Sequence, residues 1–84
     1  MMETFSIAVD SDWMEIASGP FGIQVLGSSS VALYIGSGAP AADTDQFLVI
    51  QARSDRSFSI EMEGDTAYVR CLGDGSVRVR GWRA

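Results

Sequence analysis

Histidine and lysine are both absent from this 84-residue chain, and cysteine occurs once. The lack of histidine removes the commonest metal ligand and the commonest general base near neutral pH. A serine nucleophile would therefore have no histidine or lysine beside it as a base. Paired carboxylates could act as acid and base, but the acids lie mainly at turn positions. We therefore expect a non-enzymatic protein with no catalytic residue, metal or cofactor, and a lone Cys71 buried in a strand.

Positive charge is missing from the first part of the chain. Residues 1–52 contain six acids and no base, whereas residues 53–84 contain all six arginines and five acids. A net charge of −5 argues against nucleic-acid binding, which requires a dense basic patch. The uneven distribution is compatible with self-association, in which the acidic part of one copy meets the arginines of another.

Long apolar runs are also missing. No stretch reaches the ~18 apolar residues of a membrane helix, and MMETFSIAVDSDW lacks the basic region and apolar run of a signal peptide. We therefore expect a protein that is made in a cytoplasm and does not contact a membrane. No window keeps a helical apolar period, because glycine or proline interrupts most of them.

Alternation of apolar and polar residues is what the chain does have. It predicts strands at TFSIAV, PFGIQVL, VALYIG, SFSIEM, AYVRCL and GSVRVRGW. In QFLVIQA the residues Phe47 to Ile50 are consecutively apolar, which is typical of a strand covered on both faces, with another subunit as one candidate for the second cover. The expected fold is all-β: a single domain, residues 1–84, forming a small antiparallel β-sandwich or barrel of seven to eight short strands.

Glycine-containing turns separate these strands. We predict hairpins at LGDGSV, at EMEGDTA, at the GSSS after Leu26 and at the SDR after Ala52. The longest irregular segment, GSGAPAADTDQ, is interpreted as a connection between two sheets. The alternative is a calcium site on Asp43 and Asp45, but no EF-hand spacing accompanies them.

A chain of this length buries a thin core, which partner subunits can supplement. If strands 66–72 and 75–82 pair, their arginines lie close together on the outward face and could belong to an interface. The alternative is that these arginines only form a solvated surface. Each tryptophan is either an interface anchor or a residue that pins a chain end to the core. The interface candidates are Trp13, Phe47, Val49, Arg70, Arg78, Arg80 and Trp82.

The order of these features resembles small β-rich virion proteins of tailed bacteriophages. The resemblance is carried by a tryptophan strand (DWMEIA), a V-x-L-x-I-G strand, an APAADT loop and an AYVRCLGDGSV segment, within residues 12–80. It departs at QARSDRSFS, where the pattern more often has a proline-glycine turn.

This resemblance implies a structural virion protein, foremost a capsid decoration (cement) protein bound to the major capsid protein or another virion protein. It would be a homo-oligomer, with a trimer favoured. The alternative is a tail or fibre module that binds a receptor or carbohydrate through Trp13, Tyr34 and Trp82.

Overall fold

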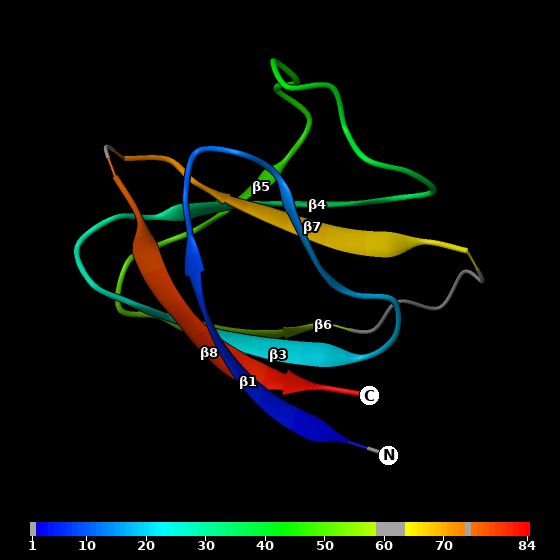
Figure 1. Ribbon diagram of the computed structural model, residues 1–84, viewed down its shortest axis with the longest axis horizontal. Coiled ribbons are helices and arrows are strands. Elements are labelled where there is room, and N and C mark those ends of the chain that lie inside the picture. Colours follow the sequence, from blue (N-terminus) through cyan, green and yellow to red (C-terminus); the bar gives the residue numbers. More distant parts are fainter. Residues whose placement is uncertain (1, 59–63, 74) are drawn as a thin grey trace.

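Eight β-strands make up the computed structural model, which describes residues 2–58, 64–73 and 75–84. No helix among these residues is long and apolar enough to cross a membrane. The strands, labelled in Figure 1, are β1 (Glu3–Val9), β2 (Met14–Ala17), β3 (Phe21–Leu26), β4 (Val31–Gly36), β5 (Leu48–Ile50), β6 (Asp55–Phe58), β7 (Thr66–Cys71) and β8 (Val77–Arg83).

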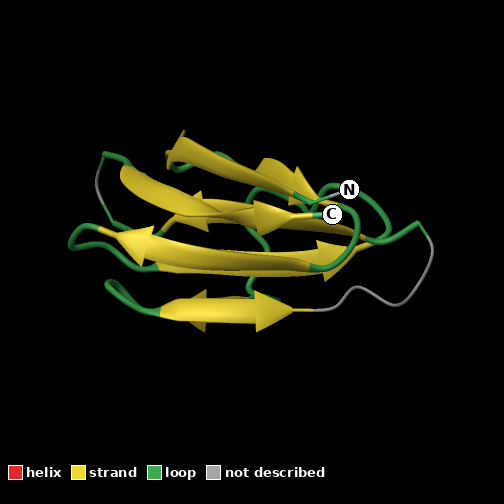
Figure 2. Cartoon of the chain, turned by 90° about the horizontal axis from the view of Figure 1, so that it is seen from below, coloured by secondary structure: helices red, strands yellow, loops and turns green. Residues whose placement is uncertain are grey.

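The strands form two four-stranded antiparallel sheets stacked on each other (Figures 1 and 2). Sheet A has the order β1-β8-β3-β6, and sheet B has the order β2-β7-β4-β5. Both sheets end in edge strands within the described part of the chain, so the fold is a β-sandwich and not a closed barrel. The predicted all-β class is confirmed in its sandwich form.

The core lies between the sheets and follows from the alternation in the sequence. In β8, for example, Val77 and Val79 are buried while Arg78 and Arg80 are exposed, because successive side chains of a strand point to opposite faces. Cys71 is buried, as predicted. The other buried core residues are Val9, Ile16, Ala17, Phe21, Ile23, Val25, Val31, Leu33, Ile50, Ala67 and Val69.

Three of the four hairpin predictions are wrong. The turns at GSSS, SDR and LGDGSV each join a strand of one sheet to a strand of the other: β3 to β4, β5 to β6, and β7 to β8. The fourth, EMEGDTA, includes residues 61–63 and so lies partly outside the described residues. The segment between β6 and β7 includes residues 59–63, so the predicted continuation of the SFSIEM strand lies outside the described residues. Glycine still allows the chain to reverse direction in these connections. Gly27 and Gly75 have φ of 117° and 81°, values that favour glycine.

The long segment 37–47 also has a different role from the predicted one. It was expected to connect two sheets, but it joins β4 to β5, which pair within sheet B. Figure 1 shows it as the green loop that rises on the outer side of β4, β5 and β7. Arg70 in β7 holds the loop through a hydrogen bond from Nη1 to the carbonyl oxygen of Ala42, at 2.9 Å.

The consecutive apolar run is not covered on both faces. β5 is only three residues long and forms the edge of sheet B, where Leu48 and Val49 are 60% and 53% exposed. Ile50 alone is buried in the core. Within one copy of the chain, the prediction of a doubly covered strand is therefore wrong.

Candidate functional site

The outer face of sheet A carries a tryptophan lying on a glycine. Trp82 in β8 is paired with Gly22 in β3 on one side and Thr4 in β1 on the other. Its half-buried indole lies over Gly22, where a Cβ atom would overlap Nε1 of Trp82. Only glycine leaves room for this arrangement, so the backbone of β3 fixes the position of the indole.

Polar side chains form the next row across the same face. Arg80 in β8, Gln24 in β3 and Asp55 in β6 are consecutive in register, and all three are exposed. With Trp82 and Ser57 they line a shallow hollow of about 260 Å³. Within the described part of the chain, no ion pair involves Arg80, so its guanidinium is available to an external acceptor.

Arg78 extends this face toward the other end of β8. It is exposed, and its Nη1 donates to the hydroxyl of Ser6 in β1 at 3.4 Å. Arg78 and Arg80 therefore lie on the same surface as Trp82, since alternate residues of a strand share a face. We call Gly22, Gln24, Asp55, Ser57, Arg78, Arg80 and Trp82 the sheet A face.

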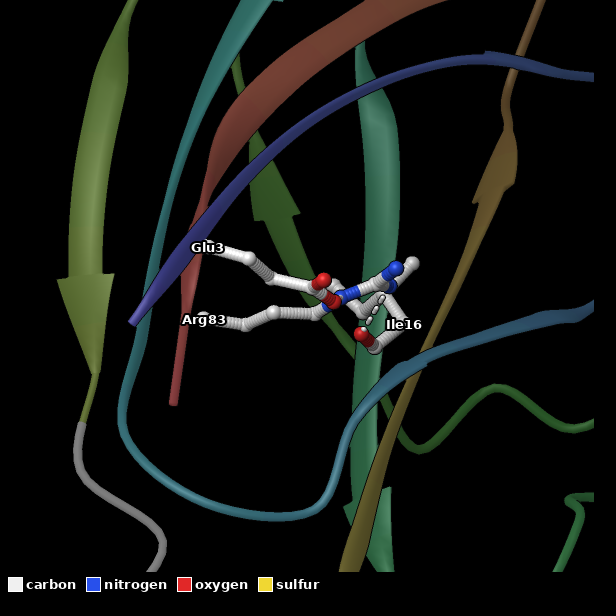
Figure 3. Close-up of polar contacts among 3 residues, drawn as sticks. All are labelled: Glu3, Ile16 and Arg83. Carbon is white, nitrogen blue, oxygen red and sulfur yellow. Dashed lines mark hydrogen bonds and ion pairs between the residues drawn. The ribbon is translucent and has the colours of Figure 1, made fainter. Parts of the chain in front are cut away.

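Arg83 ties the end of β8 to the opposite sheet. Its Nε donates to Oε1 of Glu3 at 2.6 Å, and its Nη1 donates to the carbonyl oxygen of Ile16 in β2 at 2.8 Å (Figure 3). Its Cζ also lies 4.6 Å from the centre of the Phe5 ring. The bond to Ile16 joins the end of β8 to sheet B, and the contacts with Glu3 and Phe5 join it to β1, so the end of β8 that carries Trp82 is held on two sides.

The outer face of sheet B is built differently, from aromatic rings packed edge-to-face where the 37–47 loop lies over the sheet. Trp13 packs edge-on against Tyr34 and Phe47, with ring centres 6.2 and 6.1 Å apart. Cζ of Arg70 lies 4.9 Å from the Trp13 ring centre and 5.5 Å from that of Phe47, within the range of cation–π attraction. Ala32, which pairs with Arg70, is fully buried. These side chains are mostly engaged with one another.

The seven predicted interface residues thus fall on opposite sides of the sandwich. Arg78, Arg80 and Trp82 belong to the sheet A face, whereas Trp13, Phe47 and Arg70 form the cluster on sheet B, with Val49 at the sheet B edge. The prediction that Arg70 lies beside Arg78 and Arg80 is wrong, because β7 and β8 are not paired.

Sequence reasoning missed the part of the sheet A face that comes from β3 and β6. Gln24, Asp55 and Ser57 are ordinary polar residues at alternate strand positions, and only the pairing of β3 with β6 and β8 brings them to Trp82. The one available signal was Gly22, because a glycine inside a strand often marks the close approach of another group.

The sheet A face presents an aromatic ring, guanidinium groups and other polar side chains that can make contacts. Among residues 2–58, 64–73 and 75–84, no three Cys, Asp or Glu side chains are grouped so that they could hold a metal ion. No protein-family model, curated protein or solved structure matches this chain. The resemblance to phage virion proteins therefore stays a prediction.

Proposed function

We propose that this chain is a non-enzymatic docking protein that binds a larger assembly through the sheet A face, as a capsid decoration protein binds a phage shell. The observation that carries the proposal is Trp82, held over Gly22 beside exposed Arg78 and Arg80. Tryptophan and arginine dominate the hot spots of protein interfaces. The partner surface that this face fits is acidic, with an apolar recess for the indole.

The arrangement also lowers the entropic cost of docking. Trp82 is supported from below by the β3 backbone, and the four paired strands keep its neighbours in place. A preorganised side chain loses less conformational freedom on binding than a mobile one. The aromatic residues of sheet B are less suitable anchors, because the 37–47 loop and Arg70 already contact them.

Removing the indole should weaken docking without unfolding the chain. We expect Trp82→Ala to reduce association with the assembled particle about tenfold or more, since a hot-spot truncation costs about 2 kcal/mol or more. The measurement is co-sedimentation on a density gradient. The cells used produce both the tagged chain and the particles, and the amount of chain that sediments with the particles is compared between variants. Arg80→Glu should have a similar effect through charge repulsion from an acidic partner.

A charge change elsewhere serves as the control. Ser37 is exposed at the start of the loop over sheet B, so Ser37→Glu adds negative charge away from the sheet A face and should leave co-sedimentation unchanged. Equal binding by wild type, Trp82→Ala and Arg80→Glu, each with an unaltered unfolding midpoint, would refute docking through this face.

A second candidate is binding of a carbohydrate by the same hollow. Trp82 offers an aromatic surface, and Gln24, Asp55 and Ser57 around it can exchange hydrogen bonds with sugar hydroxyls. The earlier expectation that Trp13, Tyr34 and Trp82 act together does not fit the geometry, because Trp13 and Tyr34 lie on sheet B.

Single-tryptophan variants separate this candidate from protein docking. Trp13→Phe leaves Trp82 as the only tryptophan, and Trp82→Phe leaves Trp13. If a glycan binds the hollow, titration with host surface glycans should change the fluorescence of Trp13→Phe and leave that of Trp82→Phe constant. A flat response of both variants at millimolar glycan would exclude the carbohydrate and leave protein docking as the proposal.

A further inference from the structure

Two buried hydrogen-bond donors on the outer side of sheet B have no acceptor. Nε1 of Trp13 and Nε of Arg70 are both shielded from solvent, and neither makes a hydrogen bond with any of the described residues. The two side chains adjoin each other, since Cζ of Arg70 lies 4.9 Å from the Trp13 ring centre. A buried donor without a partner is costly and uncommon in folded proteins. The two donors together therefore point to an acceptor that binds at this place.

The charge of Arg70 indicates what kind of acceptor this is. Within residues 2–58, 64–73 and 75–84, Arg70 forms no ion pair, although Asp43 and Asp45 are exposed in the loop that lies over sheet B. Its bond to Ala42 uses Nη1 and not the edge formed by Nε and Nη2. A carboxylate binds such an edge with two parallel hydrogen bonds. A half-buried guanidinium in this state favours an anionic acceptor over a neutral one.

An apolar hollow adjoins the same cluster. Its volume is about 420 Å³, and all but one of its lining residues are apolar or aromatic. Tyr34 and Phe47 line it and also pack against Trp13, so two rings belong both to the hollow and to the surroundings of the donors. The other lining residues are Leu33, Ile35, Gln46 and Leu48. The hollow is suited to the apolar body of a ligand whose charged end reaches Arg70.

We propose that this part of sheet B binds a small aromatic carboxylate. The carboxylate accepts hydrogen bonds from Nε of Arg70 and Nε1 of Trp13, and its negative charge pairs with the guanidinium. The aromatic ring of the ligand lies against Tyr34 and Phe47 in the hollow, where aromatic pairs gain from edge-to-face contact.

The 37–47 loop controls access to this site. In the described part of the chain, the bond from Nη1 of Arg70 to the carbonyl oxygen of Ala42 is the hydrogen bond that ties residues 37–46 to sheet B. The bonds of Thr44 to Ala41, at 3.1 Å, and of Gln46 to Thr44, at 3.2 Å, lie within the loop and can move with it. Little hydrogen bonding therefore opposes the opening that lets a ligand reach the two donors.

Nitrogen-15 NMR of the Trp82→Phe variant tests the proposal, because its single indole N–H signal belongs to Trp13. Benzoate should shift this signal downfield in a saturable way, with a dissociation constant on the order of 1 mM. Benzamide has nearly the same shape but no charge, so it should leave the signal almost unmoved at equal concentration. Sodium chloride keeps the ionic strength constant, which removes general effects of salt.

A substitution at Arg70 tests the two-donor edge. Arg70→Lys keeps the positive charge but loses the planar guanidinium, so it should raise the dissociation constant for benzoate about tenfold or more. Arg78→Lys is the matched control, because it makes the same exchange at an exposed position on sheet A. It should leave the affinity for benzoate unchanged.

Three results would overturn the proposal. They are a Trp13 signal that does not respond to benzoate, equal shifts with benzoate and benzamide, and undiminished benzoate binding by Arg70→Lys. The comparison with benzamide requires no change at Arg70, so it remains decisive even if Arg70→Lys does not fold.

Carboxylate binding and docking through the sheet A face fail separately. The two donors lie on sheet B, whereas Trp82 and Arg80 lie on the outer face of sheet A. Saturating benzoate should therefore leave the co-sedimentation of the wild-type chain with its particle unchanged.

Discussion

Gly81→Ala should lower the free energy of unfolding by about 2–3 kcal/mol or more, the cost of forcing an extra group into a packed site. Gly81 sits in β8 between Phe5 in β1 and Ile23 in β3. A Cβ atom there would overlap the backbone carbonyl oxygen of Gly22. A backbone oxygen in a paired strand cannot swing aside as a side chain can, so β3 and β8 would have to separate.

Urea unfolding followed by circular dichroism measures this effect. A chain of 84 residues is expected to have a total stability of roughly 4–13 kcal/mol, so the loss would move the midpoint clearly. Gly38→Ala is the control, because nothing lies within 4 Å of a Cβ atom at Gly38, and its effect should stay within about 0.5 kcal/mol. Equal midpoints for Gly81→Ala and Gly38→Ala would contradict the close approach of β3 and β8.

Phe21→Ala should be more damaging, with a loss of about 3–5 kcal/mol, the range for truncating a buried phenylalanine. Phe21 is fully buried between the sheets and has the largest of the fully buried side chains among the described residues. Its removal leaves a cavity that the surrounding strands cannot close without breaking their pairing.

Phe47→Ala provides the comparison within the same chain. Phe47 is half-buried in the outer cluster on sheet B, where water can reach the space that it vacates, so its loss should be markedly smaller than that of Phe21. Thermal unfolding of both variants measures the difference. An equal decrease in midpoint would contradict a core centred between the sheets.

The strands could be predicted from the sequence because alternation is a local property. Val77 and Val79 are buried and Arg78 and Arg80 exposed simply because the chain is extended there and one side faces the core. The positions and inward residues of β1, β3, β7 and β8 follow in the same way. None of this requires knowledge of which strands pair.

The sequence did not predict which sheet each strand joins. A turn motif shows that the chain reverses direction, but it does not show which strand the next strand pairs with. The segment around Gly75 reverses the chain as expected, yet β8 pairs with β1 and β3 in place of β7. Both a hairpin and a crossing between sheets bury the same alternate residues. The choice depends on packing between strands far apart in the sequence.

The candidate site illustrates the same limit. Trp82 was identified because tryptophan is common in interfaces, and Arg80 because alternation along its strand places it on an outward face. Gln24 and Asp55 became part of the site only through the register of β3 and β6. Arg70 was wrongly grouped with the other arginines for the same reason, since its surroundings are set by the pairing of β7 with β2 and β4.

The measurement that tests docking through sheet A most directly is hydroxyl-radical footprinting of the chain, free and bound to its particle. Trp82 and Trp13 lie on opposite outer faces, so each reports on one side of the sandwich. Docking through sheet A predicts that binding strongly reduces the oxidation of Trp82 and leaves that of Trp13 unchanged. Protection of Trp13 with undiminished oxidation of Trp82 would contradict it and place the partner on sheet B.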